Sequence, residues 1–302
     1  MATKSPQPTI DLSVIIPVRD DEERLGRCLD CLQNQTWDMS HAEILVVDNG
    51  SRRTPTDVIH RFPRTRLLQQ PVVGAYAARN AGLSAAKGDI IAFTDADCLP
   101  TPTWLSAGVA ALSADPGIGL VAGRVVTTLS RHGRRSPVEL YELLHAFPQQ
   151  RYAEQFHFGA TANVFTRRDV VEAVGNFNEA LLSGGDKEWG QRVSAAGFST
   201  VYAADAIIRH PARTSWGDYR AKLDRVFSGE ISARNHRGES SAELVRLTPR
   251  SLLPPLRSIA AHWSDPRLHT RSERMLYAVG ACVARWSGVA ASARARRSTR
   301  EA

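Results

Sequence analysis

Two carboxylates separated by one residue mark the point of the chain with the clearest chemistry. Asp95 and Asp97 follow the apolar run at residues 90–94. Such a pair at the end of a buried strand can face one crevice and share a hard divalent cation that also holds a diphosphate. Acidic residues are also common in solvated turns after strands. The pair by itself therefore leaves both interpretations open.

A third acid follows two glycines. Asp186 stands directly after Gly184 and Gly185, where a helix is expected to begin. A carboxylate on a flexible loop can lie beside an acceptor hydroxyl, and a general base must lie within hydrogen-bond reach of the proton that it removes. Asp186 can also be the N-cap of the helix, and this role is compatible with catalysis.

Strands and helices alternate around these acids. Residues 12–17 and 43–48 are short, β-branched apolar runs typical of buried parallel strands, and residues 21–35 between them carry apolar side chains at helical spacing. An alanine-rich helix at residues 75–86 and a strand at residues 90–94 follow. This order predicts right-handed crossovers, a mostly parallel sheet and a ligand crevice at the carboxyl ends of its strands.

The pattern is weaker in the second half of the chain. We expect a strand at residues 119–126 and an edge strand at residues 158–165, whereas residues 134–155 are ambiguous. The remaining expected elements are a helix at 169–174, a helix at 186–196, a short strand at 200–202 and a helical tail after about residue 215.

Three segments precede the acid pair in a fixed order, at residues 13–20, 43–51 and 74–82. With them the chain resembles family 2 of the inverting glycosyltransferases, which have the GT-A fold, over roughly its first 215 residues. The resemblance implies an α/β architecture with a mostly parallel central sheet flanked by helices. The implied divisions are an N-terminal tail at 1–10, a Rossmann-like nucleotide-sugar-binding half at 11–125, an acceptor half at 126–215 and a helical C-terminal extension with a basic tail at 216–302.

The resemblance also implies a donor site. The donor would be a nucleotide-diphosphate sugar, typically a UDP-sugar, and the cofactor would be Mn²⁺ or Mg²⁺. Arg79 suits this task because a guanidinium can fork onto phosphate oxygens, although helix-surface arginines are common. The implied nucleotide-binding residues are Pro17, Asp20, Asp48, Arg79, Asn80 and Asp95, and the implied metal ligands are Asp97, Asp95 and His210.

On the acceptor side, the resemblance makes Asp186 the general base. Thr161 and Asn163 would border the sugar and the acceptor, while Glu188 and Arg192 would support the loop or bind the diphosphate. The chain departs from the family pattern at two places. Residues 19–21 stand where the family often has Asn and Glu, and Gly185 stands where it more often has Glu.

The expected reaction is transfer of a sugar to a hydroxyl of a glycan or a lipid-linked saccharide, with inversion, in polysaccharide or cell-envelope biosynthesis. Two other classes stay open. A sugar-phosphate nucleotidyltransferase would share the early architecture, but residues 17–21 are not the glycine-rich phosphate loop that it needs. A non-catalytic protein that binds sugars or nucleotides would tolerate loss of the acids, yet Asp95, Asp97 and Asp186 are all present.

Charge and hydropathy bear on partners and location. The net charge is +7, but much of the basic excess lies near the C-terminus rather than in a stripe interleaved with aromatic residues, so nucleic acid is not an expected partner. The first ten residues lack the apolar core of a signal peptide, which favours the cytoplasm. Residues 273–293 form an amphipathic helix that either contacts the inner face of the cell membrane or packs on the catalytic domain.

Overall fold

The computed structural model describes residues 10–130, 135–236 and 249–301. The chain divides into two compact units. Unit 1 comprises residues 1–126, 148–179 and 185–209, and unit 2 comprises residues 127–147, 180–184 and 210–302. Unit 2 therefore draws on the middle of the chain as well as its end. The division expected from the sequence, with boundaries after residues 10, 125 and 215, stays a prediction.

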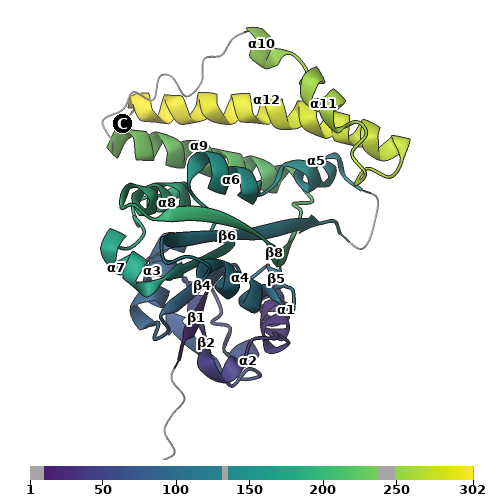
Figure 1. Cartoon of the computed structure of the whole chain (residues 1–302). Coiled ribbons are helices and arrows are strands. Elements are labelled where there is room, and N and C mark those ends of the chain that lie inside the picture. The colour runs from purple at the N-terminus through teal and green to yellow at the C-terminus, as the bar shows by residue number, and fades with distance from the viewer. Residues whose placement is uncertain (1–9, 131–134, 237–248, 302) are drawn as a thin grey trace, which may run out of the picture. The chain divides into compact units, whose positions relative to one another are not determined.

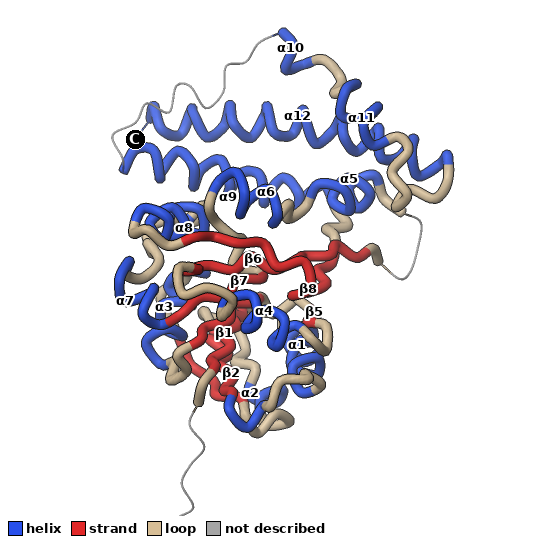
Figure 2. Tube along the Cα trace, in the orientation of Figure 1, coloured by secondary structure: helices blue, strands red, loops and turns tan. Residues whose placement is uncertain are grey.

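One sheet of eight strands organises unit 1 (Figure 2). Its strand order is β3-β2-β1-β4-β7-β6-β8-β5, and β6 and β8 continue along the chain into unit 2. The strands are β1 (Leu12–Val18), β2 (Ala42–Asp48), β3 (Thr65–Gln69), β4 (Ile90–Thr94), β5 (Leu99–Pro100), β6 (Ile118–Thr128), β7 (Asn163–Arg167) and β8 (Ser199–Pro211).

The first four strands of the sheet run parallel. Leu12 of β1 pairs with Ala42 of β2 and with Ile90 of β4, and β3 extends the parallel part beyond β2. Every residue of β2 is buried, because helices cover both faces of such a sheet. The carboxyl ends of β1, β2 and β4 thus meet at one edge, as the sequence predicts, and the α/β fold class is confirmed.

The antiparallel part of the sheet corrects two expectations. The strand expected at residues 158–165 begins only at Asn163 and lies between β4 and β6, so it is not an edge strand. The short strand expected at residues 200–202 is the first part of β8, which spans 13 residues. β7 buries the polar side chains of Asn163 and Thr166 through hydrogen bonds, and a hydropathy pattern does not reveal such a strand.

Helices of unit 1 connect and cover these strands. The alanine-rich helix α3 packs against β1 and β2, and a Cβ added at Gly82 would come within 2.5 Å of the Ile15 side chain, so glycine permits this close packing. The helices are α1 (Glu22–Gln33), α2 (Thr56–Ile59), α3 (Ala75–Ala85), α4 (Trp104–Leu112), α6 (Gln149–Phe156), α7 (Arg168–Val174) and α8 (Gly185–Ala195).

Unit 2 is helical. Helices α9 and α12 lie side by side, and α5 packs against α12, where a Cβ at Gly280 would come within 2.2 Å of the Pro137 carbonyl oxygen (Figure 1). The segment at 134–155, whose secondary structure the sequence leaves ambiguous, contains α5 and α6. Helix α12 extends beyond the amphipathic helix expected at residues 273–293. The helices of unit 2 are α5 (Pro137–His145), α9 (Trp216–His236), α10 (Pro249–Leu252), α11 (Leu256–His262) and α12 (Arg271–Glu301).

A buried carboxylate joins two segments of unit 2. Glu142 of α5 is 2% exposed, and it accepts hydrogen bonds from Arg213 Nη1 at 2.9 Å and from Lys222 Nζ at 2.9 Å. Burial opposes its charge, but the two cations outweigh burial and lower the pKa of Glu142. Residues far apart in the sequence are in this way fixed in one helical unit.

Candidate active site

The two acids of the central pair lie in the turn after β4. The Cys98 amide donates to the Asp95 carbonyl oxygen at 3.0 Å, which closes the turn. The side chains of Asp95 and Asp97 are 30% and 23% exposed, so both remain accessible. Arg24 Nη1 of α1 lies 4.0 Å from the Asp97 carboxylate. The turn thus presents two oxygen ligands at the carboxyl edge of the sheet.

Arg79 lies beneath this turn. It is 5% exposed, and its Nη2 donates to Asp95 Oδ1 at 2.7 Å. Burial opposes the charge on Arg79, but the carboxylates of Asp95 and Asp186 outweigh burial and raise its pKa. The Nε atom has no hydrogen-bond partner among the described residues. Arg79 is therefore a permanent buried cation with a donor still available.

Asp186 lies in the first turn of α8. Its Oδ2 accepts from the Thr161 amide at 3.0 Å and its Oδ1 accepts from Thr161 Oγ1 at 3.2 Å. The carboxylate is thus held by the segment before β7, and each oxygen keeps a lone pair for a further proton donor. Its role as base stays a prediction, and the geometry is compatible with it.

Tyr76 connects this acid to Arg79. The Tyr76 hydroxyl accepts from the Gly185 amide at 2.9 Å, and the ring lies under the Arg79 guanidinium at 5.8 Å. Tyr76 and Arg79 are three residues apart on α3, so they lie on one face of the helix. The sequence patterns predict no role for Tyr76. Its place one helical turn before Arg79 is the signal that could have drawn attention to it.

The predicted nucleotide-binding residues of β1 and β2 lie together at the strand ends. Pro17 of β1 pairs with Val47, and Asp48 is 4% exposed with its Oδ1 accepting from the Ser51 amide at 3.1 Å. Asp20 has a φ of 51° and accepts from the Arg52 amide at 2.9 Å. This hydrogen bond lowers the pKa of Asp20. Asp20 and Asp48 therefore both accept hydrogen bonds from the loop that follows β2.

The side chains of two predicted site residues, Asn80 and Asn163, form hydrogen bonds with the backbone of other segments. Asn80 donates to the Phe177 carbonyl oxygen at 2.9 Å, and Asn163 donates to the Arg124 and Ala206 carbonyl oxygens, each at 2.9 Å. These contacts support loops and strands, so direct contacts of either asparagine with donor or acceptor stay predictions.

Glu188 and Arg192 form an ion pair at 2.7 Å along α8. Arg192 also donates to the carbonyl oxygens of Val174 and Asn176 at the end of α7. Of the two predicted roles, support of the loop agrees with these contacts.

His210 begins the last of the three parts of unit 2 along the chain. It is 6% exposed, its Nδ1 lies 2.8 Å from the Pro211 carbonyl oxygen, and its ring packs against Phe147. Its role as a metal ligand stays a prediction.

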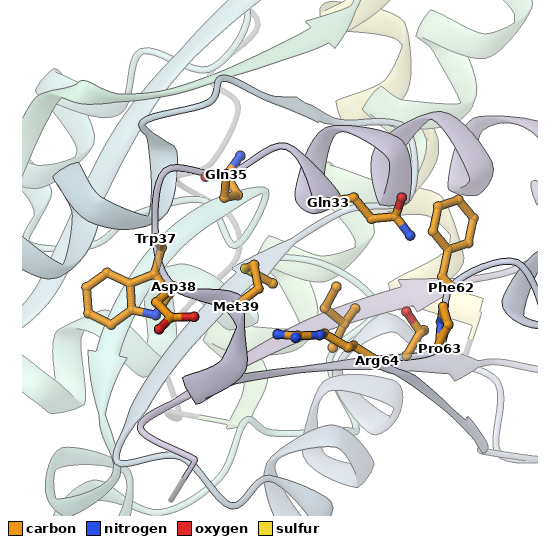
Figure 3. A pocket seen from close by; sticks show the side chains of 10 residues that line it. Gln33, Gln35, Trp37, Asp38, Met39, Phe62, Pro63 and Arg64 are labelled. Atoms are coloured by element: carbon orange, nitrogen blue, oxygen red, sulfur yellow. The ribbon is translucent and has the colours of Figure 1, made fainter. Parts of the chain in front are cut away.

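A separate groove of about 530 Å³ lies elsewhere in unit 1 (Figure 3). Trp37, Met39, Phe62 and Arg64 line it, together with residues at the beginnings of β2 and β3. It is therefore at the opposite ends of the strands from Asp48 and contains none of the acids predicted for the reaction.

The chain is similar to known glycosyltransferases. The model of the family described as glycosyl transferase family 2 matches residues 13–175. The chain is 38% identical over 225 residues to the glycosyltransferase AglE of Haloferax volcanii, covering 73% of each protein. It is 31% identical over 233 residues to the pre-mycofactocin glycosyltransferase of Mycobacterium tuberculosis, covering 74% of this chain and 47% of that protein.

Among solved structures, the mannosyltransferase PcManGT of Pyrobaculum calidifontis, in complex with GDP-Man and Mn²⁺, is similar with a TM-score of 0.64 at 19% identity. The match covers 96% of this chain and 89% of that one. At this identity the similarity concerns the fold, which is that of a GT-A glycosyltransferase.

Proposed function

The chain belongs to glycosyl transferase family 2 and is a glycosyltransferase, and on that premise we propose that it transfers a sugar, with inversion, from a nucleotide-diphosphate donor to a hydroxyl group. The proposed acceptor is a glycan or a lipid-linked saccharide in polysaccharide or cell-envelope biosynthesis. The proposed location is the cytoplasm, at the inner face of the membrane.

One observation carries the proposal. A single turn of α3 contacts both acidic segments, the turn with Asp95 and the loop before Asp186. Arg79 donates to Asp95 at 2.7 Å, and Tyr76 accepts from the Gly185 amide at 2.9 Å. The raised pKa of Arg79 has Asp95 and Asp186 among its causes, so both carboxylates lie near one guanidinium. A leaving diphosphate and an acceptor hydroxyl need such neighbouring groups.

The residues after β4 fit a divalent cation. Asp95 and Asp97 offer hard oxygen ligands, the type preferred by Mg²⁺ and Mn²⁺, and both side chains are partly exposed. The similar mannosyltransferase was solved with Mn²⁺. We infer that Asp95 and Asp97 hold the ion, with His210 as a further ligand. When bound, the ion would supply positive charge for the diphosphate.

The proposed reaction uses two residues of the chain directly. The Asp186 carboxylate accepts the proton of the acceptor hydroxyl as that oxygen forms a bond to the anomeric carbon. The bond from this carbon to the diphosphate oxygen breaks on the opposite face, so the configuration inverts. Arg79 remains charged throughout and stabilises the negative charge that develops on the leaving group.

Thermal stabilisation tests the donor site. We would measure the melting temperature of the full chain with UDP, GDP and their sugars, each with Mn²⁺, Mg²⁺ or EDTA, because a ligand that binds only the folded state raises it. We expect UDP compounds to stabilise the protein in a metal-dependent way. A response to GDP compounds alone would show that the nucleobase of the donor is guanine and not uracil. The similar mannosyltransferase was solved with GDP-Man.

The same panel separates the other candidate functions. Asp97→Asn should abolish the metal-dependent part of the shift, whereas Asp57→Asn, on the exposed surface of α2, should not. Binding without transfer to any acceptor would favour a non-catalytic protein. Formation of a nucleotide-sugar from a sugar phosphate and a nucleoside triphosphate would favour a nucleotidyltransferase.

We propose that a surface of unit 2 makes the peripheral membrane contact. Six large apolar side chains near and on α10, α11 and α12 are 44% to 69% exposed. Trp286 Nε1 donates to the Leu252 carbonyl oxygen at 3.0 Å, so α10 and α12 adjoin within this surface. Arg257 and Arg271 are exposed in the same helices. The six side chains are Leu252, Leu253, Leu256, Met275, Val279 and Trp286.

An exposed apolar surface with arginines suits the interface of an anionic bilayer. No helix of the described chain combines the length and apolar character needed to cross a bilayer. We expect the protein to float with phosphatidylglycerol vesicles but not with phosphatidylcholine vesicles. Replacing Leu252, Leu253 and Leu256 with Ser should prevent flotation, and Val226→Ser on α9 is the control. Unchanged flotation of the triple variant would contradict the proposed contact.

A further inference from the structure

The hydroxyl of Tyr76 bonds the first turn of the helix that carries Asp186. Tyr76 is 6% exposed, and its oxygen accepts from the Gly185 amide at 2.9 Å and from the Asp186 amide at 3.4 Å. Amides in the first turn of a helix have no partner within the helix. The Tyr76 oxygen supplies that partner, so the start of α8 is bonded to α3 across more than one hundred residues of sequence.

The contact with Tyr76 requires glycine at position 185. A Cβ at position 185 would come within 2.6 Å of the Tyr76 ring, closer than a real contact allows. The φ of Gly185 is not in the left-handed region, so the ring rather than the backbone conformation requires glycine. The departure from the family pattern at this position thus has a local cause: an acidic side chain cannot occupy the space that the Tyr76 ring fills.

The ring itself is held by its neighbours. It stacks on Phe177 with centroids 5.7 Å apart, and the Arg79 guanidinium lies over it at 5.8 Å. Arg79 in turn donates to Asp95. The position of the Tyr76 hydroxyl is therefore fixed relative to Asp95. Through its hydrogen bonds to the start of α8, this hydroxyl can also fix Asp186 relative to Asp95.

We propose that Tyr76 is a positioning residue, which holds the Asp186 loop through its hydroxyl at a fixed place relative to Arg79 and Asp95, and that Gly185 is required because of it. The proposal rests on the proposed function, in which Asp186 removes the acceptor proton. Tyr76 does not contact the reacting atoms in this account. It acts by keeping Asp186 from leaving the geometry in which proton transfer occurs.

The first test removes the hydroxyl and keeps the ring. For Tyr76→Phe we expect kcat to fall by about 10-fold to 100-fold, while KM for the donor and the affinity for the nucleoside diphosphate change by less than about threefold. A merely structural role would lower the melting temperature without this split. Tyr202→Phe on β8 is the matched control, because no hydrogen bond of its hydroxyl is found in the described chain. An unchanged kcat in Tyr76→Phe would overturn the proposal.

The second test measures coupling between the two residues. Gly185→Ala should lower kcat by about 10-fold or more when Tyr76 is present, but by less than about threefold when Tyr76→Leu has removed the end of the ring. Equal effects in both backgrounds would show that the residues act independently and would refute the proposal. Melting temperatures of all four proteins identify any variant that does not fold.

Amide hydrogen exchange provides a readout that does not need activity. In Tyr76→Phe the amides of Gly185 and Asp186 should exchange faster, while those of α4 should not change. Protection equal to that of the wild type would overturn the proposal. If the wild type transfers no sugar, the proposed function fails, and the exchange experiment still decides whether Tyr76 fixes the loop.

Discussion

Replacement of Asp186 by Asn separates catalysis from structure, because the asparagine can keep both contacts with Thr161. The amide oxygen of Asn can accept from the Thr161 backbone, which now lies 3.0 Å from Oδ2. Its NH₂ group can donate to Thr161 Oγ1, which reverses the hydrogen bond now 3.2 Å long, since a hydroxyl both donates and accepts. Only the charge is lost, and a hydrogen bond to a charged group exceeds a neutral one by about 1 kcal/mol.

The expected cost to catalysis is larger. A general base contributes about 10²-fold to 10⁴-fold, which corresponds to about 3 to 5.5 kcal/mol of the activation free energy. We therefore expect Asp186→Asn to melt within about 4 °C of the wild type and to turn over at least about 100-fold more slowly. The thermal shift produced by the donor nucleotide and metal should stay the same.

The assay is release of the nucleoside diphosphate at saturating donor and acceptor. Thr161→Val is the control, because it removes one hydrogen bond to the carboxylate and leaves the base in place. We expect it to lose less than about 10-fold in kcat. Turnover of Asp186→Asn within threefold of the wild type would refute the assignment of Asp186 as base.

Three further predictions concern other parts of the chain. Arg79→Met should lower kcat/KM for the donor by about 100-fold, because Asp95 loses its 2.7 Å partner and the diphosphate loses a cation; unchanged kinetics would contradict this role. Gly108→Ala should lower the free energy of unfolding by about 1 to 3 kcal/mol, because the new Cβ would come within 2.2 Å of the Phe165 ring; denaturation midpoints measure this, and an unchanged midpoint would disagree. Burial lowers the pKa of His145 to about 4. Since the unfolded residue titrates near 6.5, the unfolded chain binds the proton first, and unit 2 should lose up to about 3 kcal/mol as the pH falls from about 6.5 to 4. Melting at pH 7 and pH 4.5 tests this, and His145→Gln should reduce the loss of stability between these pH values; an equal loss in the variant would contradict the assignment.

The parallel strands could be predicted because they are buried without interruption. Residues 12–17, 43–48 and 90–94 are apolar and β-branched, and the sheet contains all three at the expected places. The strand β7 was harder to predict because it buries polar side chains. Asn163 accepts from Trp104 Nε1 at 2.8 Å, and Thr166 donates to the Gly119 carbonyl oxygen at 2.7 Å. Partners so distant in sequence leave no local pattern.

The same limit applies to the candidate site. The acids could be selected as candidates from their spacing and their place after strands and glycines, and the family resemblance supplied their expected roles. Their contacts could not, because Asp186 is held by Thr161 and its helix by Tyr76, both of which come from other segments. Likewise, the resemblance implies a nucleotide contact for Asn80, which stays a prediction, but it does not reveal the hydrogen bonds between the Asn80 side chain and the backbone of Phe177.

The division of unit 2 along the chain has a consequence for biosynthesis. Leu140 of α5 is fully buried in a cluster with Tyr277 and Ala281 of α12. A ribosome adds about 5 to 20 residues each second, so α5 leaves it on the order of 10 s before α12 exists. During that interval the apolar face of α5 has no native partner and is exposed to aggregation or to chaperones. A stop codon before α12 should therefore reduce the yield of soluble protein, even though the acids of the candidate site all precede it.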